Sequence, residues 1–73
     1  MMKAMVYVGN HVRESRTLAA LTQEELASRA GITATALSRI ERNEAEPRPS
    51  TLRKLAIALG VEPRELIKGS NDA

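Results

Sequence analysis

The stretch that decides the fold is residues 23–42, QEELASRAGITATALSRIER, which has the pattern of two short helices joined by a tight turn. The first predicted helix covers residues 23–30 and the second covers residues 34–42. In each, the residues expected to face inward recur at the three- and four-residue spacing of an amphipathic helix. These inward faces are Leu26, Ala27 and Ala30 in the first helix, and Leu37, Ile40 and Glu41 in the second.

Capping residues lie at the ends that this pattern predicts. Thr22 precedes the first helix, and Glu25 follows three residues later, as in a capping box. Thr33 stands in the same place before the second helix. Gly31 lies between the two helices, where a helix end favours a residue that tolerates positive φ. The small side chain of Ala27 permits the two helices to cross closely.

The second helix leaves a short, polar and basic face for solvent. Such a face suits insertion into the major groove of DNA. Its residues are Ala34, Thr35, Ser38, Arg39 and Arg42.

Residues 23–42 resemble the helix-turn-helix of the phage repressor and Cro proteins, the xenobiotic-response-element class. The likeness continues on both sides of the motif and covers residues 8–67. It implies an all-α fold, a compact five-helix lambda-repressor-like DNA-binding domain. The residues that match within the motif are Gln23, Ala27, Gly31, Leu37 and Ile40.

Three further helices are expected around the motif, over residues 8–19, 51–59 and 63–67. Ser50 is the predicted cap of the second of these, and Pro63 the first residue of the third. Pro47 and Pro49 are expected to stiffen the loop before residue 51. Leu18 and Leu21 are predicted to pack beneath the motif. Asn43 is expected to end the second motif helix in a left-handed conformation. Ala20 stands where the resembled family often has glycine, after the helix over residues 8–19: if the backbone there is left-handed, Ala20 carries roughly 1 kcal/mol of strain, and otherwise the turn is built differently.

Composition sets limits on the protein class. The chain has 73 residues, no cysteine, and a net charge of +2 from 11 Lys and Arg against 9 Asp and Glu. It is therefore expected to form one domain over residues 1–73, with an ordered core over 8–68 and tails at 1–6 and 69–73.

No apolar run approaches the ~20 residues of a membrane span, so a cytoplasmic protein without membrane contact is expected. The apolar residues 1–7 fit a tail, a short strand or a docking surface.

Arg16 continues the inward face of the first predicted helix, where a charge needs a partner. In the resembled family, an arginine and a glutamate at these places form a buried pair, which implies Arg16 with Glu41. Two solvated charges are the alternative.

The resemblance also implies a division of the DNA contacts between bases and phosphates. Arg39 is the candidate for a bidentate contact to guanine, and Gln23 for a phosphate at a helix start. Arg39 and Arg48 can alternatively be solvated charges, and Thr33 only a cap. Predicted base contacts are Thr33, Ala34, Thr35, Ser38 and Arg39, and predicted phosphate contacts are Gln23, Arg42, Asn43 and Arg48.

Two acidic residues oppose this assignment. Glu44 and Glu46 lie in the loop expected to face phosphate, and their charge is expected to weaken binding. His11 is the sole histidine and is expected at the surface. Because no catalytic triad, paired-carboxylate site or metal-ligand cluster is evident, we expect neither an enzyme nor a cofactor or metal.

The predicted function is a sequence-specific regulator of transcription that binds double-stranded DNA, with repression as the simplest mechanism. Relatives dimerise to reach two half-sites, which implies a homodimer. The alternative is a protein-binding module, such as an antitoxin that masks a toxin, or an adaptor. The exposed face of residues 34–42 distinguishes the two functions, because specific DNA binding needs its side chains and binding of a protein partner does not. The predicted dimer residues are Val61, Pro63, Leu66 and Ile67, and Ile57 adds an apolar side chain away from its helix's inward stripe.

Overall fold

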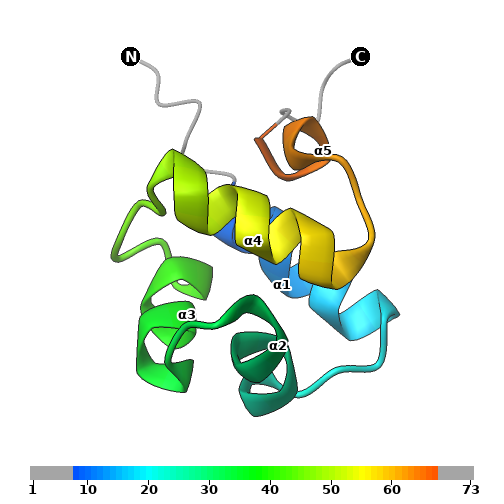
Figure 1. The fold of residues 1–73 in the computed structure, drawn as a ribbon. Helices are drawn as coiled ribbons and strands as arrows, with labels where there is room; N and C mark the ends of the chain where they lie inside the picture. The colour runs from blue at the N-terminus through cyan, green and yellow to red at the C-terminus, as the bar shows by residue number, and fades with distance from the viewer. Residues whose placement is uncertain (1–7, 68–73) are drawn as a thin grey trace.

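Apolar side chains from five helices meet in one core. The computed structural model describes residues 8–67, which form α1 (Val8–Leu18), α2 (Gln23–Ala30), α3 (Ala34–Glu41), α4 (Pro49–Leu59) and α5 (Pro63–Ile67) (Figure 1). Within these residues there is no strand, so the predicted all-α class with five helices is confirmed. The two predicted tails fall outside or at the edge of this range. The buried apolar residues are Val8, Val12, Leu26, Ala27, Ala30, Leu37, Ile40, Leu52, Leu55, Ala56 and Leu66.

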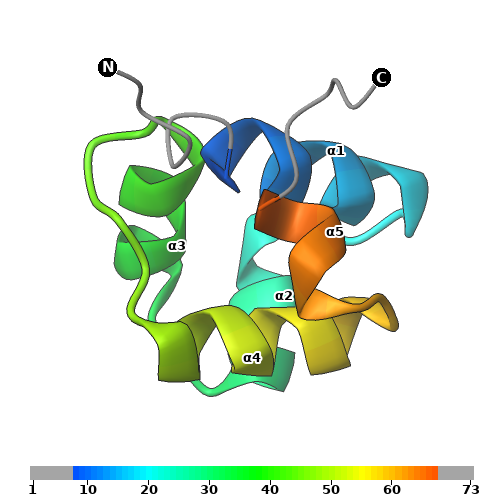
Figure 2. The same ribbon diagram turned by 90° about the horizontal axis from the view of Figure 1, so that it is seen from above.

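The helices surround this core so that α3 lies at an edge. Helix α2 packs on α3 and α4, and α1 packs on α3, α4 and α5. Seen from above, α1 and α4 lie on opposite sides of the molecule, while α3 stays at the same edge as in Figure 1 (Figure 2). One side of α3 is therefore left for solvent.

Local capping explains where α2 and α3 begin and end. The Thr22 hydroxyl accepts from the Glu25 amide at 3.0 Å, and the Glu25 carboxylate accepts from the Thr22 amide at 2.8 Å, which confirms the capping box. The Thr33 hydroxyl accepts from the Ala36 amide at 3.0 Å. Gly31 has φ 73°, which ends α2 in the left-handed conformation that was predicted for it.

Several predicted boundaries are wrong by one or two residues. Helix α1 ends at Leu18 and α3 at Glu41. Helix α4 begins at Pro49, and Arg48 precedes it without a side-chain cap, so Ser50 is not the cap. Proline fits the first turn of a helix because its φ is already helical and the missing N–H would have no helical partner there.

The prediction that Leu18 packs beneath the motif is also wrong. Its side chain is 82% exposed, whereas Leu21 is half-buried against the core. The core face of α1 runs through Val8, Val12 and Arg16, and successive helical residues are about 100° apart. Leu18 therefore points about 200° away from Arg16 around the helix, on the far side from the core.

The start of α1 lies unusually close to the end of α3. A Cβ on Gly9 would meet the carbonyl of Ile40 and the side chain of Asn43. Asn43 has φ 61°, as predicted for a residue that ends α3, and its Oδ1 accepts from the Gly9 amide at 3.2 Å. Ala20 also has positive φ, at 59°, and so carries the strain expected for a non-glycine residue.

His11 joins α1 to α5 rather than lying at the surface alone. It is half-buried, and its Nδ1 lies 3.0 Å from the carbonyl oxygen of Leu66. This contact attaches α5 to α1, and the Gly9 approach attaches the end of α3 to α1.

Candidate nucleic-acid interface

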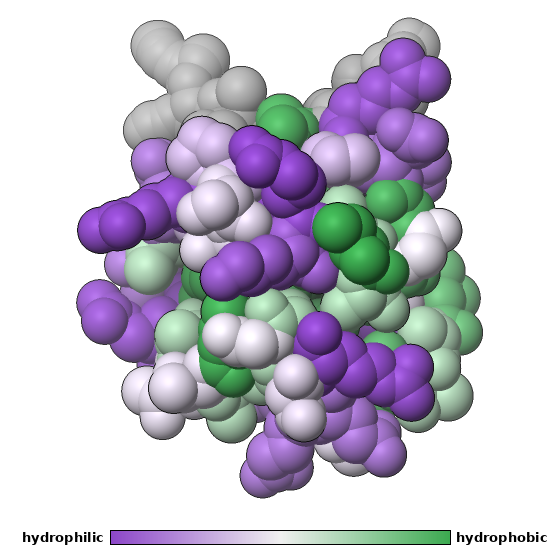
Figure 3. All heavy atoms as spheres, viewed as in Figure 1, coloured by the Kyte–Doolittle hydropathy of each residue, from purple (hydrophilic) through white to green (hydrophobic). Residues whose placement is uncertain are grey.

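The outer face of α3 carries polar side chains on a rigid, capped helix. Thr33, Thr35 and Arg39 are exposed, while Ala34 and Ser38 are half-buried. Hydrophilic side chains project from the edge of the molecule where α3 lies (Figure 3). Within residues 8–67, the Arg39 side chain makes no hydrogen bond or ion pair. The guanidinium of Arg39 therefore has no partner among these residues, and the other four predicted base-contacting residues lie beside it at the surface of α3.

The inner side of α3 is held by a buried polar network. The Arg16 guanidinium donates to Glu41 from Nε at 2.7 Å and from Nη2 at 3.0 Å, so the ion pair implied by the resemblance is formed. The Glu41 side chain is only 3% exposed. Arg16 also donates to the carbonyl of Leu21 at 2.9 Å, and the hydrogen bond to Glu41 raises the pKa of Arg16. Every buried side-chain nitrogen and oxygen in the described residues has a partner, so this network satisfies its charges.

Gln23 extends this network to the start of α2. Its Nε2 donates to Glu41 Oε1 at 3.0 Å, and the residue is half-buried. The Gln23 side chain therefore joins the buried carboxylate to the start of α2, where the first N–H groups have no helical partner. A phosphate could be bound there by these N–H groups and the remaining amide hydrogen.

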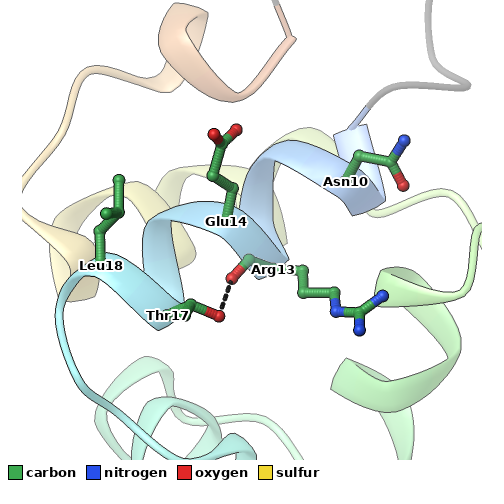
Figure 4. Close-up of a pocket in the computed structure, with 5 residues that line it drawn as sticks. All are labelled: Asn10, Arg13, Glu14, Thr17 and Leu18. Atoms are coloured by element: carbon green, nitrogen blue, oxygen red, sulfur yellow. Dashed lines mark hydrogen bonds between the residues drawn. The ribbon is translucent and has the colours of Figure 1, made fainter.

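Arg13 is a basic residue at this site that the sequence interpretation missed. A polar hollow of about 330 Å³ at the junction of α1, α2 and α3 is lined by Arg13, Arg16, Gln23, Ser38, Glu41 and Arg42. Figure 4 shows Arg13 extending from α1 toward α3, whereas Glu14 and Leu18 point to another side of the helix. The spacing of three residues between Arg13 and Arg16 was the available signal, because it places both on neighbouring parts of one helix surface.

At the end of α3, the Arg42 side chain is already hydrogen-bonded to neighbouring residues. Arg42 donates from Nε and Nη2 to the two carboxylate oxygens of Glu44, each at 3.0 Å, and from Nη1 to the Ser38 hydroxyl at 2.7 Å. These hydrogen bonds and the charge of Arg42 hold the pKa of Glu44 below its ordinary value. Both Arg42 and Ser38 are therefore engaged with neighbours in this structure.

Asn43 is exposed, and its side chain makes hydrogen bonds to α1. Besides accepting from Gly9, its Nδ2 donates to Asn10 Oδ1 at 3.2 Å. Its side chain thus joins the end of α3 to the start of α1. The role that this geometry supports is positioning of α3.

Arg48 lies on the other side of α3, just before α4. It is exposed, and with Arg39 and Glu46 it borders a hollow of about 210 Å³ between α3 and the start of α4. The two arginines thus lie on the same surface.

The predicted dimer residues do not all lie at the surface. Leu66 is fully buried in the core, so its assignment to a dimer contact is wrong: its side chain has no surface left to offer. Pro63 is exposed, and Val61 and Ile67 are half-buried. Ile57 is 75% exposed on the outer side of α4, as its place in the sequence predicted.

Across residues 8–67, no group of three or more His, Cys, Asp or Glu is placed to hold a metal ion. None of the described helices has the length and apolar character needed to cross a membrane.

This chain is similar to known proteins both in sequence and in fold. A helix-turn-helix family model, HTH_3, matches residues 12–66. An uncharacterized HTH-type transcriptional regulator, y4dJ of Sinorhizobium fredii (strain NBRC 101917 / NGR234), is 38% identical over 65 residues, or 89% of this chain and 84% of that protein.

Two solved structures have the same arrangement of helices. The restriction-modification controller protein C.AhdI from Aeromonas hydrophila is 39% identical with a TM-score of 0.81, over 85% of this chain and 94% of that chain. The P22 c2 repressor in complex with a synthetic operator is 33% identical with a TM-score of 0.80, over 86% of this chain and 96% of that chain. The chain therefore belongs to the HTH_3 helix-turn-helix family, and it has the lambda-repressor-like DNA-binding fold of transcriptional regulators.

Proposed function

We propose that this protein is a sequence-specific regulator of transcription that places α3 in the major groove of double-stranded DNA and acts as a homodimer. The observation that carries the proposal is the exposed face of α3, where Thr35 and Arg39 project from a helix whose opposite side is fixed by the core and by the Arg16–Glu41 pair. The P22 c2 repressor, which is similar over 86% of this chain, was solved with a synthetic operator.

Base recognition in this proposal depends chiefly on Arg39. An arginine can donate two hydrogen bonds to guanine O6 and N7, which is worth about 1–3 kcal/mol of discrimination. Thr33 and Thr35 can exchange hydrogen bonds with base edges, and the methyl group of Ala34 suits a thymine methyl. Ser38 has a smaller part, because its hydroxyl oxygen already accepts from Arg42.

Phosphate contacts surround that face on two sides. Gln23 and Arg13 lie on the side of α1 and α2, and Arg48 lies on the side of α4. Contacts of this kind fix the register of the protein on the duplex without reading sequence. Asn43 serves this arrangement by positioning α3 through its hydrogen bonds to α1.

The proposed dimer uses the outer surface of α4 and α5. The apolar residues proposed for it are Ile57 on α4, Val61 between the two helices, and Pro63 and Ile67 on α5, all of them exposed or half-buried. Two copies related by a two-fold axis would place their recognition helices about 34–36 Å apart on one face of DNA, and would repress by covering a promoter.

Selection of bound duplexes from a random-sequence DNA pool tests the function directly. At moderate salt, which suppresses nonspecific phosphate binding, we expect recovery of a two-fold-symmetric site. A pool without enrichment would contradict the proposal and favour the alternative, a protein-binding module such as an antitoxin for a toxin or an adaptor.

Two variants locate the recognition surface on the selected duplex. Arg39→Ala with Thr35→Ala is expected to abolish specific binding, which fluorescence anisotropy would measure. Arg29→Ala removes the same charge from the exposed surface at the end of α2 and serves as the matched control. Normal operator binding by the double variant would show that the surface is placed wrongly.

A further inference from the structure

The Arg42 guanidinium is held in the manner in which it would hold a phosphate. Its Nε and Nη2 donate side by side to the two oxygens of Glu44, at 3.0 Å each. Arginine recognises carboxylate and phosphate with the same paired geometry. Glu44 therefore occupies the edge of Arg42 that a DNA phosphate would need.

The Arg42–Glu44 pair lies at the surface, where a DNA phosphate and the Glu44 carboxylate would compete for the same guanidinium. The side chains of Arg42 and Glu44 are 58% and 52% exposed, at the end of the helix proposed to enter the groove. Ser38, on the preceding turn of α3, accepts from Nη1 and holds the guanidinium from its other side. The charge of Arg39 also lowers the pKa of Glu44, which places this carboxylate within the field of both arginines of the recognition surface.

We infer that Glu44 is an internal substitute for a DNA phosphate, and that it limits DNA affinity by withholding Arg42 from the backbone. This inference rests on the proposed function, because it concerns the same surface. A phosphate that approaches Arg42 must displace the Glu44 carboxylate or be repelled by it. Arg42 then adds little to the phosphate contacts, and the affinity that remains depends more on Gln23, Arg13 and Arg48.

Salt dependence of binding to a random duplex gives the test, because such binding arises from phosphate contacts alone. We would measure fluorescence anisotropy between about 50 and 200 mM salt, the range over which such contacts change affinity strongly. The proteins are the wild type, Glu44→Gln and Glu46→Gln. Glu46→Gln is the matched control: it makes the same charge change in the same exposed loop, but Glu46 has no ion pair within residues 8–67.

Release of Arg42 is expected to add one phosphate contact per subunit. For Glu44→Gln, the slope of log K against log salt should steepen by about one per subunit, equivalent to a roughly threefold larger loss of affinity across that range. Glu46→Gln should change the slope less. Adding Arg42→Gln to Glu44→Gln should remove the gain, because the gain depends on the freed guanidinium.

The possible outcomes separate this inference from the proposed function. Equal slopes for Glu44→Gln and Glu46→Gln, with DNA bound by the wild type, would overturn the inference and leave the function intact. Weaker binding by Glu44→Gln would also overturn it, by showing that Glu44 presents Arg42 to DNA. Absence of DNA binding by every variant at the lowest salt would overturn the proposed function and this inference together.

Discussion

Two arginine–glutamate pairs lie at the same end of α3, one on its inner side and one on its outer side. Arg16 and Glu41 form the inner pair, and Arg42 and Glu44 form the outer pair. Both are bidentate, with nitrogen–oxygen distances of 2.7 and 3.0 Å in the first and 3.0 and 3.0 Å in the second. Geometry alone therefore does not distinguish them.

The two pairs differ in burial, and this difference decides how much the stability of the fold depends on each pair. The side chains of the inner pair are 16% and 3% exposed, against 58% and 52% in the outer pair. A buried charge depends on its partner, because water cannot replace it, whereas water and salt replace the partner of an exposed charge readily. The inner pair is thus a condition for the fold, whereas the outer pair can be removed without loss of the fold.

The largest effect is expected from breaking the inner pair. Arg16→Ala leaves the Glu41 carboxylate buried without its cation, which should lower the free energy of unfolding by ~3–5 kcal/mol. Urea unfolding followed by circular dichroism would measure this loss. Arg13→Ala is the control on the same helix, and is expected to change stability by less than about 0.5 kcal/mol.

A second variant asks whether the inner pair stabilises or only avoids an unpaired charge. Arg16→Met with Glu41→Leu removes both charges, and should recover most of the stability lost in Arg16→Ala. If Arg16→Ala itself costs little, the inner pair is not buried in solution and the comparison fails.

Gly9→Ala is expected to have an intermediate effect, again on the inner side of α3. In an ordinary helix interior this change stabilises by about 1 kcal/mol. Here the added methyl group meets the Ile40 carbonyl and the Asn43 side chain, so we expect destabilisation of roughly 1–3 kcal/mol. Thermal unfolding would show the sign, and a stabilised variant would mean that α1 and α3 lie farther apart than the structure places them.

The smallest effect on stability is expected from the outer pair. At neutral pH, Glu44→Gln should leave the midpoint of urea unfolding unchanged within error, because both side chains are largely solvated. The pKa of Glu44 is lower in the fold than in the unfolded chain, mainly through its hydrogen bonds from Arg42. Any contribution of the pair is therefore full above the unfolded carboxyl pKa and lost as the pH falls through the lowered folded value.

This sign gives a measurable pattern. Any difference between the unfolding midpoints of the wild type and Glu44→Gln should be within error at neutral pH, and it should not grow as the pH is lowered and Glu44 takes up its proton. A difference that grows toward low pH would show that Glu44 has another partner.

Much of the candidate site was predictable because its causes are local. The capping box of Thr22 and Glu25 and the turn at Gly31 depend on residues three and four positions apart. The exposed side of α3 follows from the inward spacing of Leu37, Ile40 and Glu41. Base and phosphate contacts by these residues remain predictions, since they concern DNA.

Other contacts were not evident from the sequence, because they depend on how side chains are oriented and on which helices meet in the fold. Ser38, Arg42 and Asn43 looked alike as polar residues at a helix end, yet Asn43 bonds to α1 while Arg42 bonds to Glu44 and Ser38. Leu66 has the apolar side chain expected of a dimer contact, but that side chain is buried in the core. Spacing within one helix cannot show which of two apolar faces its neighbours will cover.

The sequence by itself determined the five helices, the caps of α2 and α3, the motif and the family resemblance, because hydrogen bonds and side-chain periodicity over a few residues decide them. The spacing and the resemblance indicated an inward Glu41 paired with Arg16, but only the tertiary structure decided how deeply each charge is buried and that Glu44 pairs with Arg42. Glu41 and Glu44 are three residues apart and each pairs with an arginine, but α1 covers one and solvent surrounds the other. The free energy of a charge depends on the surroundings that the whole fold creates around it, and no short stretch of sequence contains those surroundings.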